Sequence, residues 1–600
     1  MLLKKNQPIR IVLPQTPSAV ELFAAEELEK YLFRIFNATV GEADALFVLG
    51  ADAKNPAFTG EEGFLIQSEG NVIRIIGSDG NGVLYGVYEF LERYLGCCFG
   101  AYSGADKNAG EIVPTYEEKE LSDIAYCKPK SDRPYRTAIV QYGNKAGNPD
   151  HKLNIPFFDW LAKNRYNRIL TWSSVYEFYH EQGLDQEAAK RGIRFTVGHH
   201  ESSHLFLPEN GNKYFPEPYY KTHPEFFKLQ EDGTRFYNDS ETGQLVYCCR
   251  NEEMIETFAK NVLAWAEQNP AIDTVALWPN DGIQPACTCP LCKPYSKVEN
   301  YTYFVNSVAE RVRKERPDFH FDMLIYVDLW ECPEGLKLNE GIFVDESTWS
   351  PKGLRHVGKA DGSCINGTFL EENLLRWKAT GAEVVYYDYY MGGYGVRQLL
   401  IPMADEVQSI WKNFAKKGVS GAGTQIECFN HWNHLLNFYT FGRTAYDASL
   451  TVEDNIRALV KLFGEGAEEL AQILHAYESC MEGQPEMFDC GHYMAEHLDL
   501  EKLYALYDRA LLKASTPRFR NNIRLMRMVL RYTELESKEV NYDHEGFYPV
   551  QPDYEDPTGE LAKMTEFESF WRNDPGYGIM IPLKSEKTYD GDMTWYDFEE

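Results

Sequence analysis

An adjacent amide and carboxylic acid, Asn280 and Asp281, stand where a short apolar run ends and a loop begins. The run from Val275 to Trp278 reads as a fully buried strand, which Pro279 ends before the turn at Gly282. At the end of a parallel strand such a pair is placed for acid/base chemistry, whereas the alternative is an Asx-type turn without a chemical role. We take Asn280 and Asp281 as a candidate catalytic pair, with Asp281 as the general acid/base.

Carboxylates and aromatic rings also follow the other apolar runs in the middle of the chain. Glycoside hydrolysis uses this combination, because one acid protonates the leaving oxygen and a second group stabilises the oxocarbenium-like carbon. We therefore predict that Glu346 or Glu427 completes the catalytic group. The residues expected to bind substrate are Trp172, His199, His200, His204, Trp278, Asp328, Trp349, Asp388, Tyr389, Arg397 and Trp432.

Several of these residues have a purely structural alternative. Glu346 and its neighbour Asp345 are suited to capping the turn that follows them. Asp388, inside the run YYDYY, is equally suited to being a buried acid held by tyrosine hydroxyls. The segment GHHESSH, with His200 and His204 four positions apart, resembles a metal motif, but it follows a strand and does not lie on a clear helix. We favour hydrogen bonding to substrate for its histidines.

Three cysteines, Cys287, Cys289 and Cys292, follow the candidate pair with the spacing C-x-C-x2-C. Together with Cys249 they would provide the four thiolates of a closed structural zinc site. The alternative is free thiols, or a disulfide that braces the loop. We expect no cofactor for catalysis, and structural zinc is the one metal that the sequence suggests.

Eight apolar strand candidates lie between Arg136 and Gln425, mostly separated by helix-sized gaps. They are RTAIVQYG, NRILTW, IRFTVG, TVALWP, HFDMLIYV, GIFVDES, EVVYYDYY and GVSGAGTQ. This rhythm predicts a (β/α)8 barrel, whose active sites lie at the carboxyl ends of the strands. An open parallel sheet is the alternative.

Two other units flank the predicted barrel of residues 130–448. Residues 1–125 alternate strands with helices, as in IRIVLP, the helical pattern from Ala19 to Phe33, ALFVLG, VIRIIG and the pattern from Gly82 to Leu95. Residues 449–600 read as a helical region followed by an irregular tail. The sequence therefore predicts an α/β protein: an α/β accessory domain, a catalytic barrel and a carboxyl-terminal helical region.

The composition is that of a folded protein without affinity for polyanions. A formal net charge of −31 leaves no basic excess to neutralise a phosphate backbone, so we expect no nucleic-acid partner. No apolar run is long enough to span a membrane, and the start of the chain has no apolar signal-peptide core. We expect a cytoplasmic protein, or a secreted or periplasmic one whose signal peptide was trimmed.

Two parts of the sequence resemble known families. The segments ELFAAEELEKYL and GVLYGVYEFLERYLGCCF resemble the non-catalytic domain that precedes the barrel in α-glucuronidases and β-hexosaminidases. The segments HPEFF, LWPNDG, CTCPLC, CINGTF and EVVYYDYY resemble domain-of-unknown-function family 4838, part of which is classified as glycoside hydrolase family 163. The resemblance covers roughly residues 8–450. It implies endo-β-N-acetylglucosaminidase activity on N-glycans, with a glycan or glycoprotein as substrate.

The resemblance also implies roles for the candidate pair. Several N-acetylglucosaminidase families hold an adjacent polar pair after the fourth strand. The first member orients the acetamido group of the substrate, which acts as the nucleophile, and the second protonates the glycosidic oxygen. This chain has Asn-Asp where other families have Asp-Glu, Asp-Asp or Asn-Glu. An amide donates a hydrogen bond to the acetamide, but it does not accept a proton as a carboxylate does.

Two other functions fit the same residues. A glycosidase of a different sugar, such as a uronic acid, would use two protein carboxylates and a cation at the pocket, for which Arg397 is the candidate. A non-catalytic carbohydrate-binding protein would need the aromatic rings and hydrogen-bonding groups, but no acid with a raised pKa. For a glycosidase, we expect Trp278 and neighbouring carboxylates to wall Asp281 and to raise its pKa.

Overall fold

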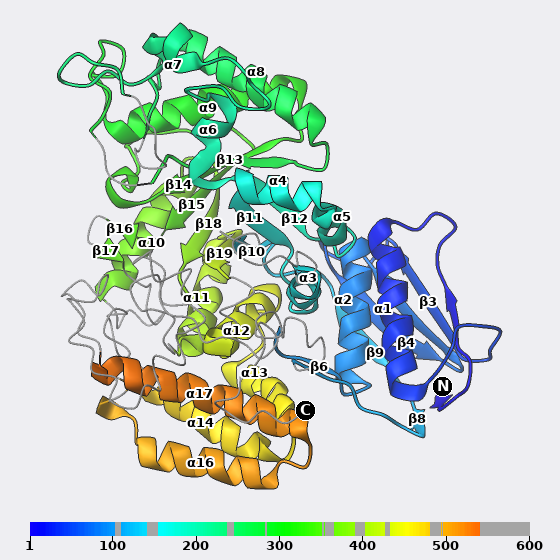
Figure 1. The fold of residues 1–600 in the computed structure, drawn as a ribbon. Helices are drawn as coiled ribbons and strands as arrows, with labels where there is room; N and C mark the ends of the chain where they lie inside the picture. The colour runs from blue at the N-terminus through cyan, green and yellow to red at the C-terminus, as the bar shows by residue number, and fades with distance from the viewer. Residues whose placement is uncertain are drawn as a thin grey trace.

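The computed structural model describes residues 1–102, 110–140, 154–236, 245–281, 285–347, 349–350, 353–354, 365–390, 402–426, 432–480, 494 and 496–539. An α/β unit, a barrel and a group of helices follow one another along the chain, and Figure 1 shows them as three adjoining bodies. Within the part of the chain that the structure describes, no helix has the length and apolar character needed to cross a membrane.

The central body is a closed barrel of eight parallel strands, which confirms the predicted (β/α)8 fold. Parallel strands are covered on both faces, so they appear in the sequence as continuous apolar runs rather than as alternating patterns. Each of the eight predicted runs overlaps a barrel strand. The strands are β10 (Tyr135–Val140), β11 (Arg168–Trp172), β12 (Arg194–Gly198), β13 (Thr274–Ala276), β14 (His320–Ile325), β15 (Ile342–Ser347), β18 (Glu383–Asp388) and β19 (Gly421–Gln425).

Helices in the connections surround the barrel (Figure 1). The longer ones are α3 (Asn154–Lys163), α4 (Ser173–Glu181), α5 (Leu184–Ala189), α8 (Glu252–Gln268), α9 (Lys297–Glu315), α10 (Ile365–Lys378), α11 (Ala404–Lys417) and α12 (Leu435–Tyr446). Short elements occupy the loops: η2 (His199–Glu201), α6 (Ser202–Phe206), α7 (Tyr219–Thr222), η3 (Pro224–Phe226), η4 (Val327–Leu329), β16 (Trp349–Ser350), β17 (Gly353–Leu354) and η6 (Trp432–His434).

The amino-terminal unit is a five-stranded mixed sheet with two helices, α1 (Ala19–Phe36) and α2 (Gly80–Arg93), side by side on one face. Ser18 and Glu21 form a capping box that starts α1. The strand order is β2 (Arg10–Val12), β3 (Leu46–Ala51), β5 (Val72–Gly77), β4 (Phe64–Glu69) and β9 (Ala125–Lys128). Two small ribbons, β1 (Leu2–Lys4) with β8 (Glu118–Glu120) and β6 (Cys98–Phe99) with β7 (Glu111–Ile112), complete the unit.

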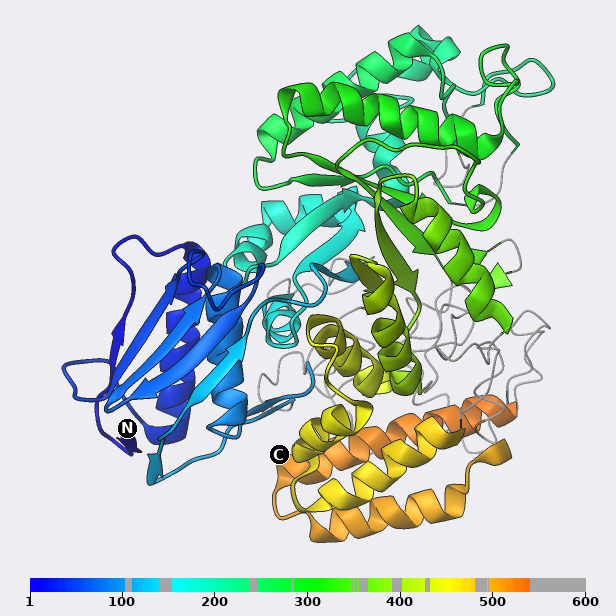
Figure 2. The ribbon, with the colours of Figure 1, turned by 180° about the vertical axis from the view of Figure 1, so that it is seen from behind.

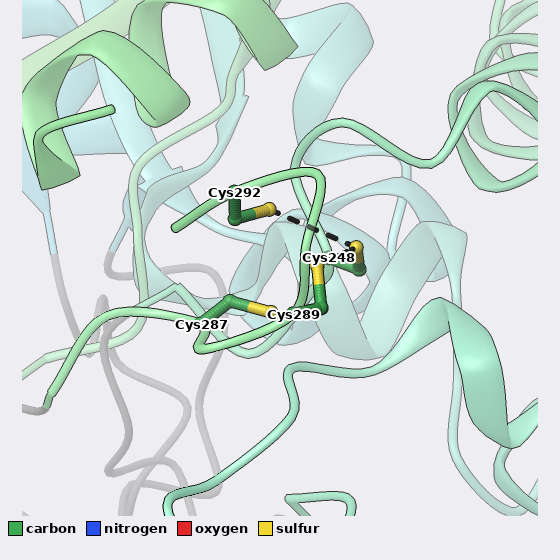
Figure 3. A group of neighbouring side chains, drawn as sticks. All are labelled: Cys248, Cys287, Cys289 and Cys292. Atoms are coloured by element: carbon green, nitrogen blue, oxygen red, sulfur yellow. Dashed lines mark hydrogen bonds between the residues drawn. The ribbon is translucent and has the colours of Figure 1, made fainter. Parts of the chain in front are cut away.

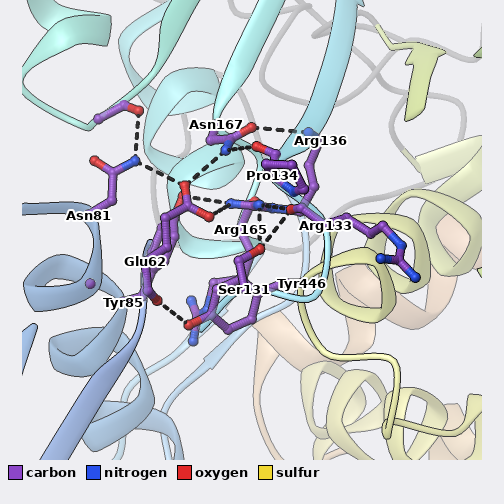
Figure 4. A network of polar contacts seen from close by, with 12 residues as sticks. Glu62, Asn81, Tyr85, Ser131, Arg133, Pro134, Arg136, Arg165, Asn167 and Tyr446 are labelled. Atoms are coloured by element: carbon purple, nitrogen blue, oxygen red, sulfur yellow. Dashed lines mark hydrogen bonds and ion pairs between the residues drawn. The ribbon is translucent and has the colours of Figure 1, made fainter. Parts of the chain in front are cut away.

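A buried ion pair joins this unit to the amino-terminal end of the barrel (Figure 4). Arg136 of β10 is fully buried, and its Nη2 lies 2.7 Å from Oε2 of Glu62. The other guanidinium nitrogens donate to Ser131 Oγ and to the carbonyl oxygens of Arg133 and Arg165. Asn167 Nδ2 donates to Glu62 Oε1 at 2.8 Å. Because each charge is paired and hydrogen-bonded, the pair fixes the position of the unit against the strands.

The carboxyl-terminal helices form a second core, separate from that of the barrel (Figure 2). They are α13 (Val452–Leu459), η7 (Val460–Gly466), α14 (Ala467–Cys480), α16 (Leu500–Lys513) and α17 (Pro517–Glu539). Thr451 and Asp454 form a capping box at the start of α13, as is typical of an independent helix start. The predicted irregular tail of residues 545–600 lies outside the described residues.

Candidate active site at the carboxyl ends of the barrel strands

A strained turn at the end of β12 brings two histidines to this end of the barrel. Gly198 has φ +138°, and a Cβ there would lie 2.3 Å from the carbonyl oxygen of Ala276, so only glycine fits the position. The next residue, His199, has φ +48°, which is unusual for a residue with a side chain. Strain of this kind concentrates at functional sites.

Seven mostly buried aromatic side chains from five strand ends form a continuous cluster of ring contacts, here called the aromatic floor. His199 stacks on Trp172 with ring centroids 4.9 Å apart and contacts Trp278 at 4.5 Å. Trp278 in turn stacks on Tyr387 at 5.8 Å. The members of the floor are Trp172, His199, His200, Trp278, Tyr326, Tyr387 and Tyr389, which also touch through the His200–Trp278, His200–Tyr326 and Tyr387–Tyr389 pairs.

The floor contains buried polar atoms that lack a hydrogen-bond partner among the described residues. Both ring nitrogens of His199 and Nε1 of Trp172 are such atoms. Burial, with a smaller contribution from His200, lowers the pKa of His199 well below its ordinary value, so the ring is neutral and offers one donor and one acceptor. Unpartnered buried polar atoms are costly, which makes these atoms candidates for bonding a ligand.

The side chain of Asn280 is buried and held by two neighbouring side chains. Its Oδ1 accepts from Ser203 Oγ at 2.7 Å, and its Nδ2 donates to His204 Nε2 at 3.3 Å. On its other side, His204 Nδ1 lies 3.3 Å from Glu209 Oε2. A neutral His204 with its proton on Nδ1 satisfies both contacts, because Nε2 is then the acceptor that the amide needs. Glu209, His204 and Ser203 therefore fix the orientation of the Asn280 amide.

Asp281, the next residue, is exposed. We expected Trp278 to wall it, but Trp278 is buried within the floor and donates from Nε1 to Asp322 Oδ1 at 2.6 Å. The charge of Asp281 is among the causes that raise the pKa of Tyr389, after burial of that tyrosine. Asp281 is therefore near the Tyr389 edge of the floor and open to solvent.

Strand alternation separates Asp345 from Glu346 on β15. Phe343, two residues before Asp345, contacts Tyr135 of β10 at 4.7 Å across the barrel, so this side of β15 faces the barrel interior. Asp345 Oδ1 has no partner among the described residues. Burial, and then the charges of Asp322 and Glu346, raise the pKa of Asp345 well above its ordinary value.

Glu346 lies on the opposite side of β15, where its Oε1 accepts from Asn373 Nδ2 of α10 at 3.2 Å. Burial raises its pKa well above the ordinary value. The structure thus places Glu346 between the barrel and its outer helix and does not bring it to the aromatic floor. The inward carboxyl group of this strand is Asp345, because successive residues of a strand face opposite sides.

The family of the chain follows from its sequence. The family model described as "Domain of unknown function (DUF4838)" matches residues 107–475, which is more than half of the chain. The chain belongs to the DUF4838 family. A comparison with curated proteins found no match.

Solved structures share the fold of this DUF4838 chain. A GH138 enzyme targeting pectin rhamnogalacturonan II superposes with a TM-score of 0.55 at 12% identity and covers 89% of this chain and 88% of its own. BtGH115A, a GH115 4-O-methyl-α-glucuronidase with specificity for decorated arabinogalactans, gives 0.54 at 13% identity, with 88% and 73% covered. CpGH84B gives 0.50 at 11% identity, with 91% of each chain covered. At these identities the likeness shows the fold.

The remaining predicted residues of the DUF4838 chain lie away from the floor or outside the described part. Asp388 accepts from Tyr386 Oη at 3.0 Å and from the Tyr389 amide at 2.7 Å, as in the structural alternative for this acid. Asp328 accepts from Lys297 Nζ at 2.7 Å. Trp432 packs into the second core, with the carboxyl-terminal helices. Arg397, Glu427 and the side chain of Trp349 lie outside the described residues.

Sequence reasoning missed four groups of the DUF4838 site. Tyr326 and Tyr387 of the floor stand inside apolar runs, where a tyrosine reads as part of a buried strand. Ser203 and Glu209 contact Asn280 and His204 from the β12–α8 connection. The segment GHHESSH was the available signal for Ser203, since it places two serines beside the predicted histidines.

The cysteine prediction was wrong in one member. The four sulfur atoms that converge belong to Cys248, Cys287, Cys289 and Cys292, and all lie within 4.8 Å of one another (Figure 3). Cys249 packs instead in the main core, and its Sγ lies 3.8 Å from the Tyr247 carbonyl oxygen. At the turn before α8 the two side chains point to different sides, Cys248 into the cluster and Cys249 into the main core.

Proposed function

We propose that this DUF4838 protein is a retaining glycoside hydrolase that acts on N-acetylhexosamine-containing glycans, as an endo-β-N-acetylglucosaminidase. The observation that carries the proposal is the aromatic floor beside Asn280 and Asp281, at the carboxyl end of a closed (β/α)8 barrel. Ligand sites of such barrels lie at this end, and they combine apolar or aromatic walls with few polar groups. Sugar rings have apolar C–H faces that pack on aromatic rings. Their hydroxyl groups can hydrogen-bond to His199 and Trp172.

The two neighbouring residues would divide the chemistry. Asn280, held by Ser203 and His204, would donate an amide hydrogen to the acetamido group of the substrate and position it for attack on the anomeric carbon. Asp281 would protonate the departing glycosidic oxygen and then deprotonate the attacking water. Asp281 is exposed without substrate, and a glycan seated on the floor would cover its carboxyl group.

The comparisons support the class of reaction. Two of the similar structures are named as a GH138 enzyme and a GH115 glucuronidase, and both share the barrel fold over most of this chain. One fold hosts many functions, so the site residues of this chain carry the functional assignment. The net charge of −31 favours a neutral glycan over a polyanionic ligand.

A second candidate is a glycosidase of a uronic acid, which the likeness to the glucuronidase BtGH115A favours. Such an enzyme needs a cation for the sugar carboxylate, and the predicted one, Arg397, lies outside the described residues. Two protein carboxylates would then carry the chemistry. Asp345 would be a candidate beside Asp281, because it faces the barrel interior and its Oδ1 lacks a partner among the described residues.

Product analysis on a panel of substrates separates these candidates. The panel holds N-glycoproteins, chitobiosides, aryl N-acetylglucosaminides and aryl glucuronides. We expect release of an N-glycan with β-configuration at the new reducing end. We also expect inhibition by a thiazoline analogue of the N-acetylglucosamine oxazoline. Cleavage of glucuronides alone would favour the second candidate. Glycan binding without cleavage of any substrate would contradict both and identify a carbohydrate-binding protein.

A further inference from the structure

We propose that Cys248, Cys287, Cys289 and Cys292 bind one structural zinc ion, which ties together the two loops before α8 and α9. Cys248 lies three residues before the N-cap of α8, Asn251, and the other three cysteines lie in the loop that leads from Asp281 to α9. The four sulfur atoms thus come from two connections that are separated along the chain by α8 and β13. An ion bound to all four would fix the position of one loop relative to the other.

The spacing of the sulfur atoms fits a tetrahedral site. Zinc–sulfur bonds of about 2.3 Å place neighbouring sulfur atoms of a four-thiolate site about 3.8 Å apart. Sγ of Cys248 lies 3.3 Å from Sγ of Cys289 and 3.7 Å from Sγ of Cys292, and the whole set lies within 4.8 Å (Figure 3). All four thiols are free and buried. Thiolate ligands in this arrangement select zinc over harder cations such as magnesium.

The surroundings distinguish this cluster from ordinary buried cysteines. A buried free cysteine usually packs as a small apolar side chain within a larger core, as Cys249 does. The four cysteines instead form a cluster of their own, with Leu229 as the partly buried apolar residue that packs against it. The amide of Leu229 donates to Cys287 Sγ at 3.2 Å, a bond of the type that stabilises a thiolate.

Hydrogen bonds around the cluster already connect the two loops. Asn300 of α9 donates from Nδ2 to the carbonyl oxygen of Cys292 at 3.0 Å and accepts at Oδ1 from Arg250 Nε at 2.7 Å. Arg250 stands two residues after Cys248. Such outer contacts orient ligands in metal sites. The turn from Cys289 to Cys292 is closed by the Cys292 amide, which donates to the Cys289 carbonyl at 3.2 Å.

The ion would act on structure and not on substrate. Four protein ligands leave no open position for water or a sugar oxygen, so the site is closed in the sense of structural zinc sites. The ion would instead anchor the loop that begins directly after Asp281. The proposal is independent of the reaction that the barrel performs, because it depends on the sulfur geometry alone.

Elemental analysis of the full chain tests the proposal, with two neighbouring cysteines as matched variants. The wild type, purified without chelator from zinc-supplemented cells, is expected to contain about one zinc per chain. Cys249→Ser is expected to keep the ion, because Cys249 lies outside the cluster, whereas Cys248→Ser is expected to bind zinc at least about tenfold more weakly against a competing chelator. Cobalt exchanged into the wild type is expected to give the intense visible spectrum of a tetrahedral thiolate site.

Three results would overturn the proposal. The first is a wild-type chain without zinc whose 13 cysteines all react as free thiols after denaturation. The second is a wild-type chain that contains iron in place of zinc. The third is an equal loss of zinc from Cys248→Ser and Cys249→Ser. If Cys248→Ser does not fold, release of zinc from the native wild type by a mercurial thiol reagent supports the proposal, and its absence contradicts it.

Discussion

A buried charged pair at one end of the barrel contrasts with buried polar groups at the other end that lack a partner among the described residues. At the amino-terminal end, Arg136 is fully buried, and its guanidinium is paired with Glu62 and hydrogen-bonded to three further oxygen acceptors. At the carboxyl-terminal end, both nitrogens of His199 and Oδ1 of Asp345 have no partner among the described residues. The first end is built for stability and the second keeps bonding capacity for a ligand, as expected for this fold.

Breaking the ion pair at the amino-terminal end should give the largest loss of stability. Arg136→Met leaves the buried Glu62 carboxylate without its cation, which costs about 3–5 kcal/mol in the free energy of unfolding. Turnover of the folded fraction should stay unchanged, since Arg136 lies at the far end of the strands. Urea denaturation, followed by fluorescence, measures the first quantity. Adding Glu62→Gln should recover part of the loss, and a variant as stable as the wild type would contradict the comparison.

The buried carboxyl group of Asp322 should make the free energy of unfolding depend on pH. Burial raises its pKa from 3.8 to about 7, so the folded protein holds a proton that the unfolded chain releases. The resulting stability is complete below about pH 4 and is lost as the pH rises towards 7. Asp322→Asn keeps an oxygen acceptor for Trp278 Nε1 but cannot ionise. Its stability relative to the wild type should rise by about 2–3 kcal/mol from pH 5 to pH 8. A difference that does not vary with pH would contradict this account.

Removing the support of Asn280 should lower turnover without unfolding the protein. His204→Phe takes away the acceptor for Asn280 Nδ2, and a misplaced reacting group costs up to about a hundredfold in rate. The loss should be similar for a natural glycan and a dinitrophenyl glycoside, because acetamide positioning matters to both. His223→Phe, away from the floor and stacked on Phe226, is the control and should behave as the wild type. Equal kinetics of the two variants would remove His204 from the site.

His199→Phe should show the smallest effect. It should raise the free energy of unfolding but weaken substrate binding. Phenylalanine keeps the stack on Trp172 and removes two buried nitrogens that have no partner among the described residues, so stability should rise by about 1 kcal/mol. The KM for a glycan should rise by about tenfold if a sugar hydroxyl bonds to this ring. Thermal unfolding and steady-state kinetics on one preparation measure both. A less stable variant with an unchanged KM would make His199 an ordinary core residue.

The sequence was informative about the barrel strands for a physical reason. Strands buried on both faces are apolar throughout, and helix-sized gaps separate them, so all eight stood out between Arg136 and Gln425. Because the strands are apolar on both faces, the sequence pattern does not show which side chains face the barrel interior. Asp345 and Glu346 are adjacent and both buried, and only the contacts of Phe343 and Asn373 show that they point to opposite sides.

Site residues were predictable where they directly follow a strand. They were less predictable where the conformation of a loop determines the position of the side chain. Trp172, His199, His200 and Trp278 meet in the floor because each is at or just beyond a strand end. Trp432 has the same kind of position in sequence, yet its 3-10 turn carries it into the core of the carboxyl-terminal helices. The side chains of Cys248 and Cys249 point to different sides of the backbone, and the spacing of cysteines in a sequence does not reveal this.

The most direct test of the central claim compares two substrates with Asp281→Asn. If the carboxyl-terminal end is a glycosidase site with Asp281 as general acid, kcat on a natural N-glycan should fall by about two to four orders of magnitude. The loss should be much smaller on a 2,4-dinitrophenyl glycoside, whose leaving group departs without a proton, and the melting temperature should change little. Near-normal turnover of the N-glycan by Asp281→Asn would contradict the account and move the search for the acid to Asp345.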